Sequence, residues 1–144
     1  AWTVNFEPKV VKEFDGALQS VTKLVGVSDD LDRVRRCETD AQAAFGAEAS
    51  AHRSQPYYLD ITNKDANKGA VLEYLSHSLD IPAEEIATIG DQPNDVLMFK
   101  RSGFSIAMGN ASDEVKTQAT AVTDSYNEEG FAKAMERFVL GPRD

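Results

Sequence analysis

The sequence contains a single cysteine, Cys37, in 144 residues, so neither an intrachain disulfide nor a cysteine-based zinc cluster can form. It has no apolar stretch near the roughly 20 residues that a membrane-spanning helix needs. No signal-peptide pattern opens it. Since nothing in this composition argues for an oxidising compartment, we expect a cytoplasmic protein without a membrane partner.

Positive charge is also scarce, because 15 Lys and Arg stand against 24 Asp and Glu, for a formal net charge of -9. We expect no nucleic-acid partner, since such binding requires basic side chains that neutralise phosphates. One basic pocket for a small phosphorylated ligand remains compatible with this charge. His52 and His77 lack metal-ligand spacing, and the sequence has no Ser-His-Asp arrangement, Walker loop or dinucleotide glycine fingerprint.

The first part of the sequence predicts a strand, a helix and two further strands. Residues 21–27 are rich in β-branched side chains, which is typical of a strand. Ser28 is the expected N-cap of a helix that runs to about Phe45 and ends at Gly46. Residues 47–53 and 57–62 are two candidate strands, and we expect them to pair antiparallel.

The second part predicts alternating helices and strands, which indicates a parallel sheet with right-handed crossovers. Asn67 is expected to cap a helix that begins at Lys68 and carries Val71, Leu75 and Leu79 on one face. The remaining elements are a strand ending at Gly90, a helix over 93–102, a strand over 104–108, a helix capped by Ser112, a strand over 119–123 and a helix over 128–139. Only three strands are predicted, so one side of this sheet should lack a neighbour within the chain.

Acidic side chains gather where the strand ending at Gly90 meets the next helix. Asp91 follows the strand directly, and Asp95 lies one helical turn later. Ligands of open α/β sheets bind beyond the carboxyl ends of the strands, and Mg²⁺ takes one or two carboxylates together with phosphate oxygens. Alternatively, Asp91 is only a helix cap, and Asp95 compensates the helix dipole or holds a metal-bound water or a lysine.

Lys68 is placed against the usual preference, because a positive charge is unfavourable at the start of a helix. A phosphate bound there would explain the placement, since lysine binds phosphate as a point charge. A solvated surface lysine is the alternative, and Lys64 is the nearest competitor for the phosphate role. The turn over residues 108–112 is a weaker candidate for a phosphate loop.

Three motifs, in this order and spacing, resemble the Cof-type phosphatases of the haloacid dehalogenase-like hydrolase superfamily. They are Asn67-Lys68-Gly69-Ala70, Ile89-Gly90-Asp91-Gln92-Pro93-Asn94-Asp95 and Ala107-Met108-Gly109-Asn110-Ala111. The resemblance covers residues from about Val21 to the C-terminus. It implies an α/β fold, namely the second half of a parallel Rossmann-like core preceded by the end of an α+β cap.

The resemblance also implies a chemistry in which an aspartate attacks a phosphate monoester and becomes an aspartyl phosphate, which water then hydrolyses. By residue, it makes Lys68 a catalytic group that binds the phosphate, Asn94 a second phosphate contact, and Asp91 and Asp95 catalytic residues at a Mg²⁺ ion. The substrate would be a small phosphorylated metabolite, with sugar phosphates as one class. A kinase or mutase on the same fold would share the site.

The sequence departs from the family at the nucleophile, an Asp-x-Asp near the start of the protein. Asp30-Leu31-Asp32 matches this sequence pattern, but it stands at the start of a predicted helix. We therefore expect residues 1–62 to be the C-terminal part of a cap, residues 63–144 to be half of a core, and the chain alone to be inactive. The alternative is a non-catalytic phosphate-binding or interaction module. Tyr57 and Tyr58 are candidates for a substrate contact or for edge packing.

Overall fold

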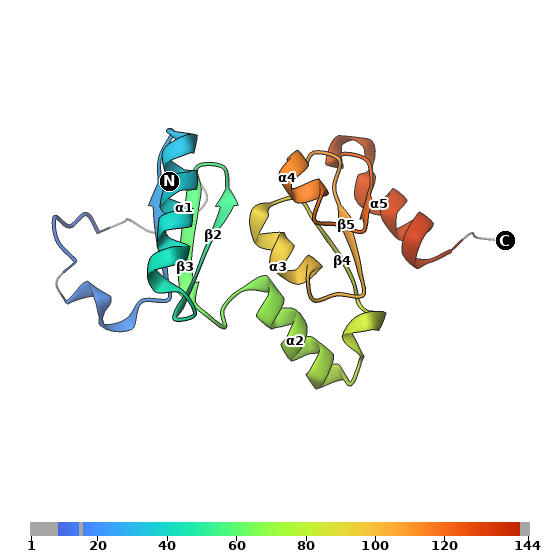
Figure 1. Cartoon of the computed structure of the whole chain (residues 1–144), viewed down its shortest axis with the longest axis horizontal. Coiled ribbons are helices and arrows are strands. Elements are labelled where there is room, and N and C mark those ends of the chain that lie inside the picture. The colour runs from blue at the N-terminus through green and yellow to red at the C-terminus, as the bar shows by residue number, and fades with distance from the viewer. Residues whose placement is uncertain (1–8, 15, 142–144) are drawn as a thin grey trace.

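The computed structural model describes residues 9–14 and 16–141, which form two separate three-stranded sheets with their helices (Figure 1). Residues 1–8 and 15 of the expected cap part, and residues 142–144 of the expected core part, lie outside the described residues. The first sheet has the strand order β1-β3-β2, and the second has the order β4-β5-β6. None of the described helices combines the length and apolar character needed to cross a membrane.

The first sheet is entirely antiparallel, and one helix covers one of its faces. After a 3-10 turn at Ala17–Ser20, its elements are β1 (Lys23–Val27), α1 (Leu31–Phe45), β2 (Ala49–Gln55) and β3 (Tyr58–Asn63). Val34 of α1 packs on Ala51 and Leu59, and all three are buried. The predicted β-α-β-β order and the antiparallel pairing of the last two strands are confirmed.

The prediction that Ser28 caps α1 is wrong. The N-cap is Asp30, whose side chain accepts a hydrogen bond from the Arg33 backbone N–H at 3.0 Å. Ser28 lies two residues before this N-cap, and its hydroxyl accepts a hydrogen bond from the Asp30 backbone N–H at 3.2 Å. Both residue types satisfy free amides equally well, so the choice depends on where the backbone enters helical geometry.

The second sheet is parallel, as expected. Its strands are β4 (Ala87–Gly90), β5 (Phe104–Ala107) and β6 (Ala121–Val122), so β4 is an edge strand among the described residues. Its helical elements are α2 (Lys68–Leu79), η2 (Ala83–Glu85), η3 (Pro93–Asp95), α3 (Val96–Phe99), α4 (Asp113–Lys116), η4 (Tyr126–Glu128), α5 (Gly130–Ala134) and the π-turn η5 (Met135–Val139). The expected N-caps of α2 and α4 are confirmed, because Asn67 and Ser112 accept from the Ala70 and Val115 N–H groups.

The single helix expected over 93–102 is wrong in its extent. A 3-10 turn replaces its first part, and regular helix ends at Phe99. Gly103 is required for a reason other than stopping a helix, since an added Cβ there would lie 2.0 Å from the Glu84 carbonyl oxygen. The close backbone approach is a tertiary contact, which helix propensities do not report.

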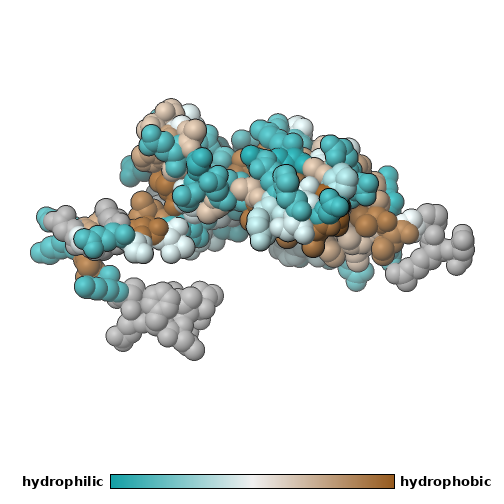
Figure 2. Space-filling view, turned by 90° about the horizontal axis from the view of Figure 1, so that it is seen from below, coloured by the Kyte–Doolittle hydropathy of each residue, from teal (hydrophilic) through white to brown (hydrophobic). Residues whose placement is uncertain are grey.

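The α2 helix packs against α3 and leaves its apolar stripe exposed. Val71, Leu75 and Leu79 are 52%, 45% and 61% exposed. The view from below shows hydrophobic patches on this part of the molecule (Figure 2). The expectation that one side of the parallel sheet lacks a neighbour is confirmed for the part of the chain that the structure describes. Such a free edge with apolar surroundings is a site of association.

Arg53 of β2 connects the two sheets through carboxylates on both sides. The buried Glu38 carboxylate of α1 accepts from the Arg53 backbone N–H at 2.8 Å and from its Nε at 2.5 Å. Arg53 Nη2 lies 3.7 Å from the Glu114 carboxylate of α4, which belongs to the parallel-sheet part. Because Arg53 is itself only 8% exposed, its charge depends on these partners.

We expect Glu38→Ala to lower the free energy of unfolding by about 3 kcal/mol, because it leaves the Arg53 guanidinium buried with one exposed partner. Urea unfolding followed by circular dichroism would measure the loss. Glu48→Ala is the matched control, since Glu48 is exposed, and it should change stability by about 0.5 kcal/mol or less. Equal effects of the two substitutions would contradict a structural role for the Glu38–Arg53 pair.

Candidate active site

Two neighbouring parallel strands deliver an acid and an amide to the same edge of the sheet. β4 ends at Gly90 and is followed by Asp91, while β5 ends at Ala107 and leads to Asn110. The Asn110 side-chain amide donates to Asp91 Oδ2 at 2.8 Å. A parallel pairing places both carboxyl ends together, which is why residues 19 positions apart in sequence are in contact.

Asp95 organises the turn after β4. It is only 2% exposed, and its Oδ2 accepts from the backbone N–H groups of Asp91 and Gln92, both at 2.8 Å. Its Oδ1 accepts from the Lys68 ammonium. This geometry matches the alternative in which Asp95 holds a lysine, whereas its role as a metal ligand stays a prediction.

Lys68 begins α2 directly after the Asn67 cap, and its side chain is 48% exposed. Its contact with Asp95 places the ammonium at the same sheet edge as Asp91, because Asp95 also binds the Asp91 amide. Of the two lysines considered, Lys68 and not Lys64 lines the cavity at this edge. A positive charge and a carboxylate therefore lie on one rim of the parallel sheet.

A cavity of about 380 Å³ separates this rim from the antiparallel sheet. Lys68 and Asn94 line it from the side of the parallel sheet. The side-chain oxygen Oδ1 of Asn94 is buried and has no hydrogen-bond partner within the described residues. Ser50, His52, Asp60 and Thr62 line it from β2 and β3. Lys68 and Asn94 thus line this cavity, whereas Asp91 lines two other cavities together with Asn110, and Asp95 joins the Lys68 ammonium to the Asp91 backbone.

Asn110 was considered only as part of the weak phosphate-loop candidate over residues 108–112, and Ser50, Asp60 and Thr62 were not selected from the sequence. The sequence does place Asn110 shortly after β5, and β5 is the neighbour of β4, the strand that leads to Asp91. Gly109 before Asn110 has a structural reason, since an added Cβ would lie 2.6 Å from the Ser125 backbone nitrogen. Tyr57 and Tyr58 stack edge-on with ring centroids 4.5 Å apart, and neither lines the cavity beside Lys68.

The donor set around Asp91 fits a hard divalent cation bound jointly with a ligand. The described hydrogen bonds to Asp91 all engage Oδ2, and Mg²⁺ in phosphate sites takes one or two carboxylates, water and phosphate oxygens. Within residues 9–14 and 16–141, no group of three or more His, Cys, Asp and Glu side chains forms a complete protein cage.

Comparisons with known proteins support these observations. A family model described as haloacid dehalogenase-like hydrolase matches residues 3–135. The chain is 31% identical over 134 residues to the 5-amino-6-(5-phospho-D-ribitylamino)uracil phosphatase YwtE of Bacillus subtilis, covering 93% of this chain and 46% of that protein. It is 41% identical over 80 residues, 56% of this chain and 36% of the relative, to a phosphoglycolate phosphatase of Methanothrix thermoacetophila.

Solved structures give the same fold. A haloacid dehalogenase-like hydrolase from B. subtilis superposes with a TM-score of 0.78 at 26% identity, covering 90% of this chain and 46% of that one. The subclass IIB sugar phosphatase BT4131 superposes with a TM-score of 0.77 at 26% identity, covering 93% and 49%. The chain therefore spans about half the length of these relatives. The expected fold class and the resemblance to Cof-type phosphatases are both confirmed.

Gly90→Ala tests how closely the turn depends on Asp95. The added Cβ would lie 2.4 Å from the Asp95 Cγ, so the carboxylate has to move away from Lys68 and the two amides. We expect a loss of about 2 kcal/mol or more in the free energy of unfolding, measured in urea. Gly26→Ala is the control, because its Cβ would meet the Leu59 Cβ at an ordinary 3.7 Å. A Gly90→Ala variant as stable as the control would contradict the tight packing.

Proposed function

Because the chain belongs to the haloacid dehalogenase-like hydrolases, we propose that it is part of a Mg²⁺-dependent phosphatase of small phosphorylated metabolites. The observation that carries the proposal is the contact chain from Lys68 through Asp95 to Asp91 at one rim of the parallel sheet. Phosphoryl transfer needs mainly positioning and neutralisation of the phosphate oxygens, and these residues are suited to both.

Each residue has a proposed part in the reaction. Lys68 neutralises the charge of the phosphate, and Asp95 fixes the position of the lysine ammonium. Asn94, whose side chain lines the same cavity, donates its amide to a phosphate oxygen. Asp91 is the metal ligand, with Asn110 holding its carboxylate and Asp95 supporting the shell around it. A bound Mg²⁺ would supply further neutralisation of the phosphate oxygens.

The nucleophile of the proposed reaction is an aspartate outside this chain. Asp30-Leu31-Asp32 is the only Asp-x-Asp in the sequence, and Asp30 caps α1 while Asp32 pairs with Arg35 at 3.4 Å. Both are thus engaged on the helix of the antiparallel sheet. We infer that the aspartyl phosphate forms on a strand from an N-terminal half of the protein, with residues 1–62 as the end of its cap and residues 63–144 as half of its core.

The free edge of β4 is the place where such a strand would add. A parallel strand beside β4 would end next to Asp91, so its carboxyl end would face the same rim. The helix that precedes it or follows it would cover the exposed stripe of Val71, Leu75 and Leu79. The chain covers 46% of the length of YwtE, so the remainder of that relative is long enough to contain such an N-terminal half.

We expect the isolated chain to leave p-nitrophenyl phosphate intact. The polypeptide extended by the coding sequence upstream of Ala1 should hydrolyse this ester with Mg²⁺ and lose activity in EDTA. The measurement is p-nitrophenol release at 405 nm under otherwise identical conditions. Turnover by the pure 144-residue chain would overturn the proposed need for an external nucleophile.

In the extended protein, Lys68→Met and Asp91→Asn should each lower kcat by about 100-fold or more, since each removes a charge that faces the phosphate or its metal. Lys64→Met is the matched control, because Lys64 lies in the same loop region and does not line the cavity. It should keep kcat within about two-fold. Equal losses from Lys64 and Lys68 would count against the assigned phosphate contact.

A non-catalytic phosphate-binding or interaction module is the second candidate. The engagement of Asp30 and Asp32 on α1 favours it, since no other Asp-x-Asp exists in the sequence. A start codon directly before Ala1 would support the module, whereas an upstream apolar strand ending in Asp-x-Asp would support the enzyme. The phosphatase proposal also includes a cytoplasmic location and a small phosphorylated metabolite as the partner.

A further inference from the structure

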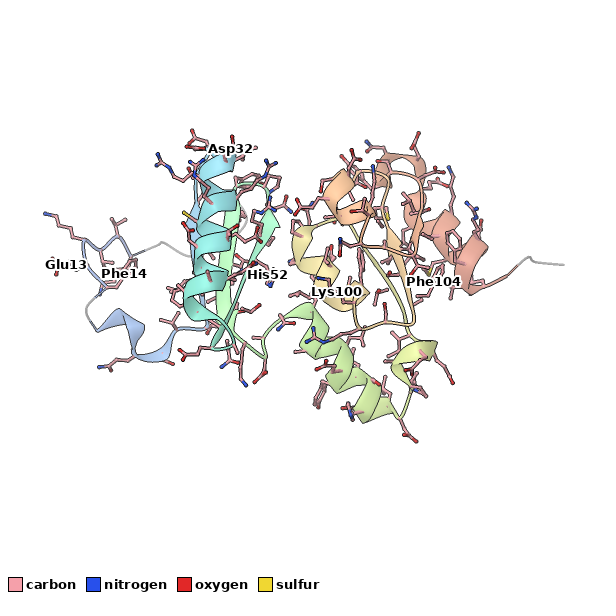
Figure 3. All side chains as sticks on the ribbon, viewed as in Figure 1. Glu13, Phe14, Asp32, His52, Lys100 and Phe104 are labelled. Carbon is pink, nitrogen blue, oxygen red and sulfur yellow. The ribbon has the colours of Figure 1, made fainter. Side chains whose placement is uncertain are left out.

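Asn110 contacts the proposed metal ligand with one end of its side-chain amide and a backbone turn with the other. β5 begins at Phe104, which Figure 3 labels, and Asn110 follows the opposite end of that strand. Its Nδ2 donates to Asp91 Oδ2 at 2.8 Å, while its Oδ1 accepts from the Tyr126 backbone N–H at 3.3 Å. A backbone N–H can only donate, so the oxygen of the amide has to face Tyr126. The NH₂ group of the amide therefore faces Asp91.

The turn that carries the Tyr126 N–H is fixed by backbone contacts. The Gly130 N–H donates to the Ser125 carbonyl oxygen, and the Gly109 N–H donates to the Asp124 carbonyl oxygen, both at 3.0 Å. A Cβ added at Gly130 would lie 1.8 Å from the Asp124 carbonyl oxygen, so the turn and the start of α5 are in direct backbone contact. The side chain that accepts from Tyr126 is thus anchored on a part of the core that does not depend on the metal ligand.

Two side-chain amides beside Asp91 use the same carboxylate oxygen. Asn110 donates to Oδ2 at 2.8 Å, and the Gln92 Nε2 donates to it at 3.2 Å. A carboxylate has about four lone-pair sites, half of them on each oxygen, so two donors occupy those of Oδ2. Among the residues that the structure describes, every hydrogen bond to this carboxylate reaches Oδ2. Oδ1 is therefore the oxygen available to a cation.

Mg²⁺ and Ca²⁺ make different demands on such a carboxylate. Mg²⁺ is octahedral, with oxygens at about 2.0–2.1 Å, and combines one or two carboxylates with water and phosphate oxygens. Ca²⁺ takes about six to eight oxygens at about 2.3–2.6 Å and accepts a carboxylate through one or both of its oxygens. Asp91 would have to release Asn110 and Gln92 before it could bind a cation through both oxygens.

We propose that Asn110 is a positioning residue that limits Asp91 to one metal-binding oxygen and thereby makes the site favour Mg²⁺ over Ca²⁺. This inference rests on the proposed function, because it assumes that Asp91 is the metal ligand. It also gives a role to the turn over residues 125–130, whose backbone orients the Asn110 amide. Asp91 and Asn110 together line cavities of about 450 and 260 Å³, which leave room for a hydrated cation beside the pair.

The test is an NMR titration of the ¹⁵N-labelled 144-residue chain with MgCl₂ and, separately, with CaCl₂, in a buffer without phosphate. Both cations should shift the backbone amides of Asp91 and Gln92, and Asp91→Asn should remove these shifts. Asn110 is exposed, so Asn110→Ala leaves the core intact and frees Oδ2 from its shorter hydrogen bond. We expect the ratio of Ca²⁺ affinity to Mg²⁺ affinity to rise about three- to ten-fold, the effect of one hydrogen bond.

Two substitutions at Tyr126 separate the backbone donor from the side chain. Tyr126→Pro removes the N–H at the first position of η4, where proline is tolerated, and the preceding Ser125 already has extended backbone angles (φ −65°, ψ 159°). It should raise the same affinity ratio about two- to five-fold, because the Asn110 amide loses the donor that orients it. Tyr126→Ala keeps the N–H and should change the ratio by less than about two-fold.

The outcomes separate this inference from the proposed function. If MgCl₂ shifts the Asp91 and Gln92 amides but Asn110→Ala leaves the affinity ratio unchanged, only the role of Asn110 is refuted. An equal ratio in Tyr126→Pro and Tyr126→Ala would refute the role of the turn. If MgCl₂ shifts neither amide, or shifts them equally in Asp91→Asn, Asp91 is not the metal ligand and the proposed metal site fails together with this inference.

Discussion

The buried carboxylate of Asp95 is the contact on which the rest of the site depends. A charge with 2% exposure is costly unless its oxygens are satisfied, and here an ammonium and two backbone amides satisfy them. These hydrogen bonds join the start of α2 to the turn after β4. Gly90 is needed at that turn because a Cβ would collide with the same carboxylate. One side chain thereby sets the positions of Lys68 and Asp91.

The antiparallel sheet contributes the other wall of the cavity, and its position depends on β2. Arg53 on this strand is bound to Glu38 on one side and lies near Glu114 on the other. The neighbouring residue His52 lines the cavity beside Lys68, so the ionic contact and the cavity wall lie on adjacent residues of one strand. A shift of β2 relative to the parallel sheet would change the width of the cavity between His52 and Lys68.

Local signals predicted most of the elements. Asn67 and Ser112 were recognised as caps because a side-chain acceptor one residue before a helix satisfies nearby amides wherever it occurs. The stripe of Val71, Leu75 and Leu79 follows from helical spacing alone. The helix over 93–102 was wrong in its extent, because Asp95 binds the distant Lys68 and Gly103 lies close to the distant Glu84. The Ser28 cap was wrong because the backbone enters helical geometry two residues later, after Asp30.

The sequence by itself determined which residue types stand at the strand ends, and hence that Lys68, Asp91, Asn94 and Asp95 were candidates for phosphate chemistry. Only the tertiary structure decided that Asp95 binds Lys68, that Asn110 holds Asp91, and that His52 and Asp60 line a cavity together with Lys68 and Asn94. The physical reason is that caps, turns and periodicity act over a few residues. Contacts between residues 19 and 27 positions apart arise only when strands pair and helices pack.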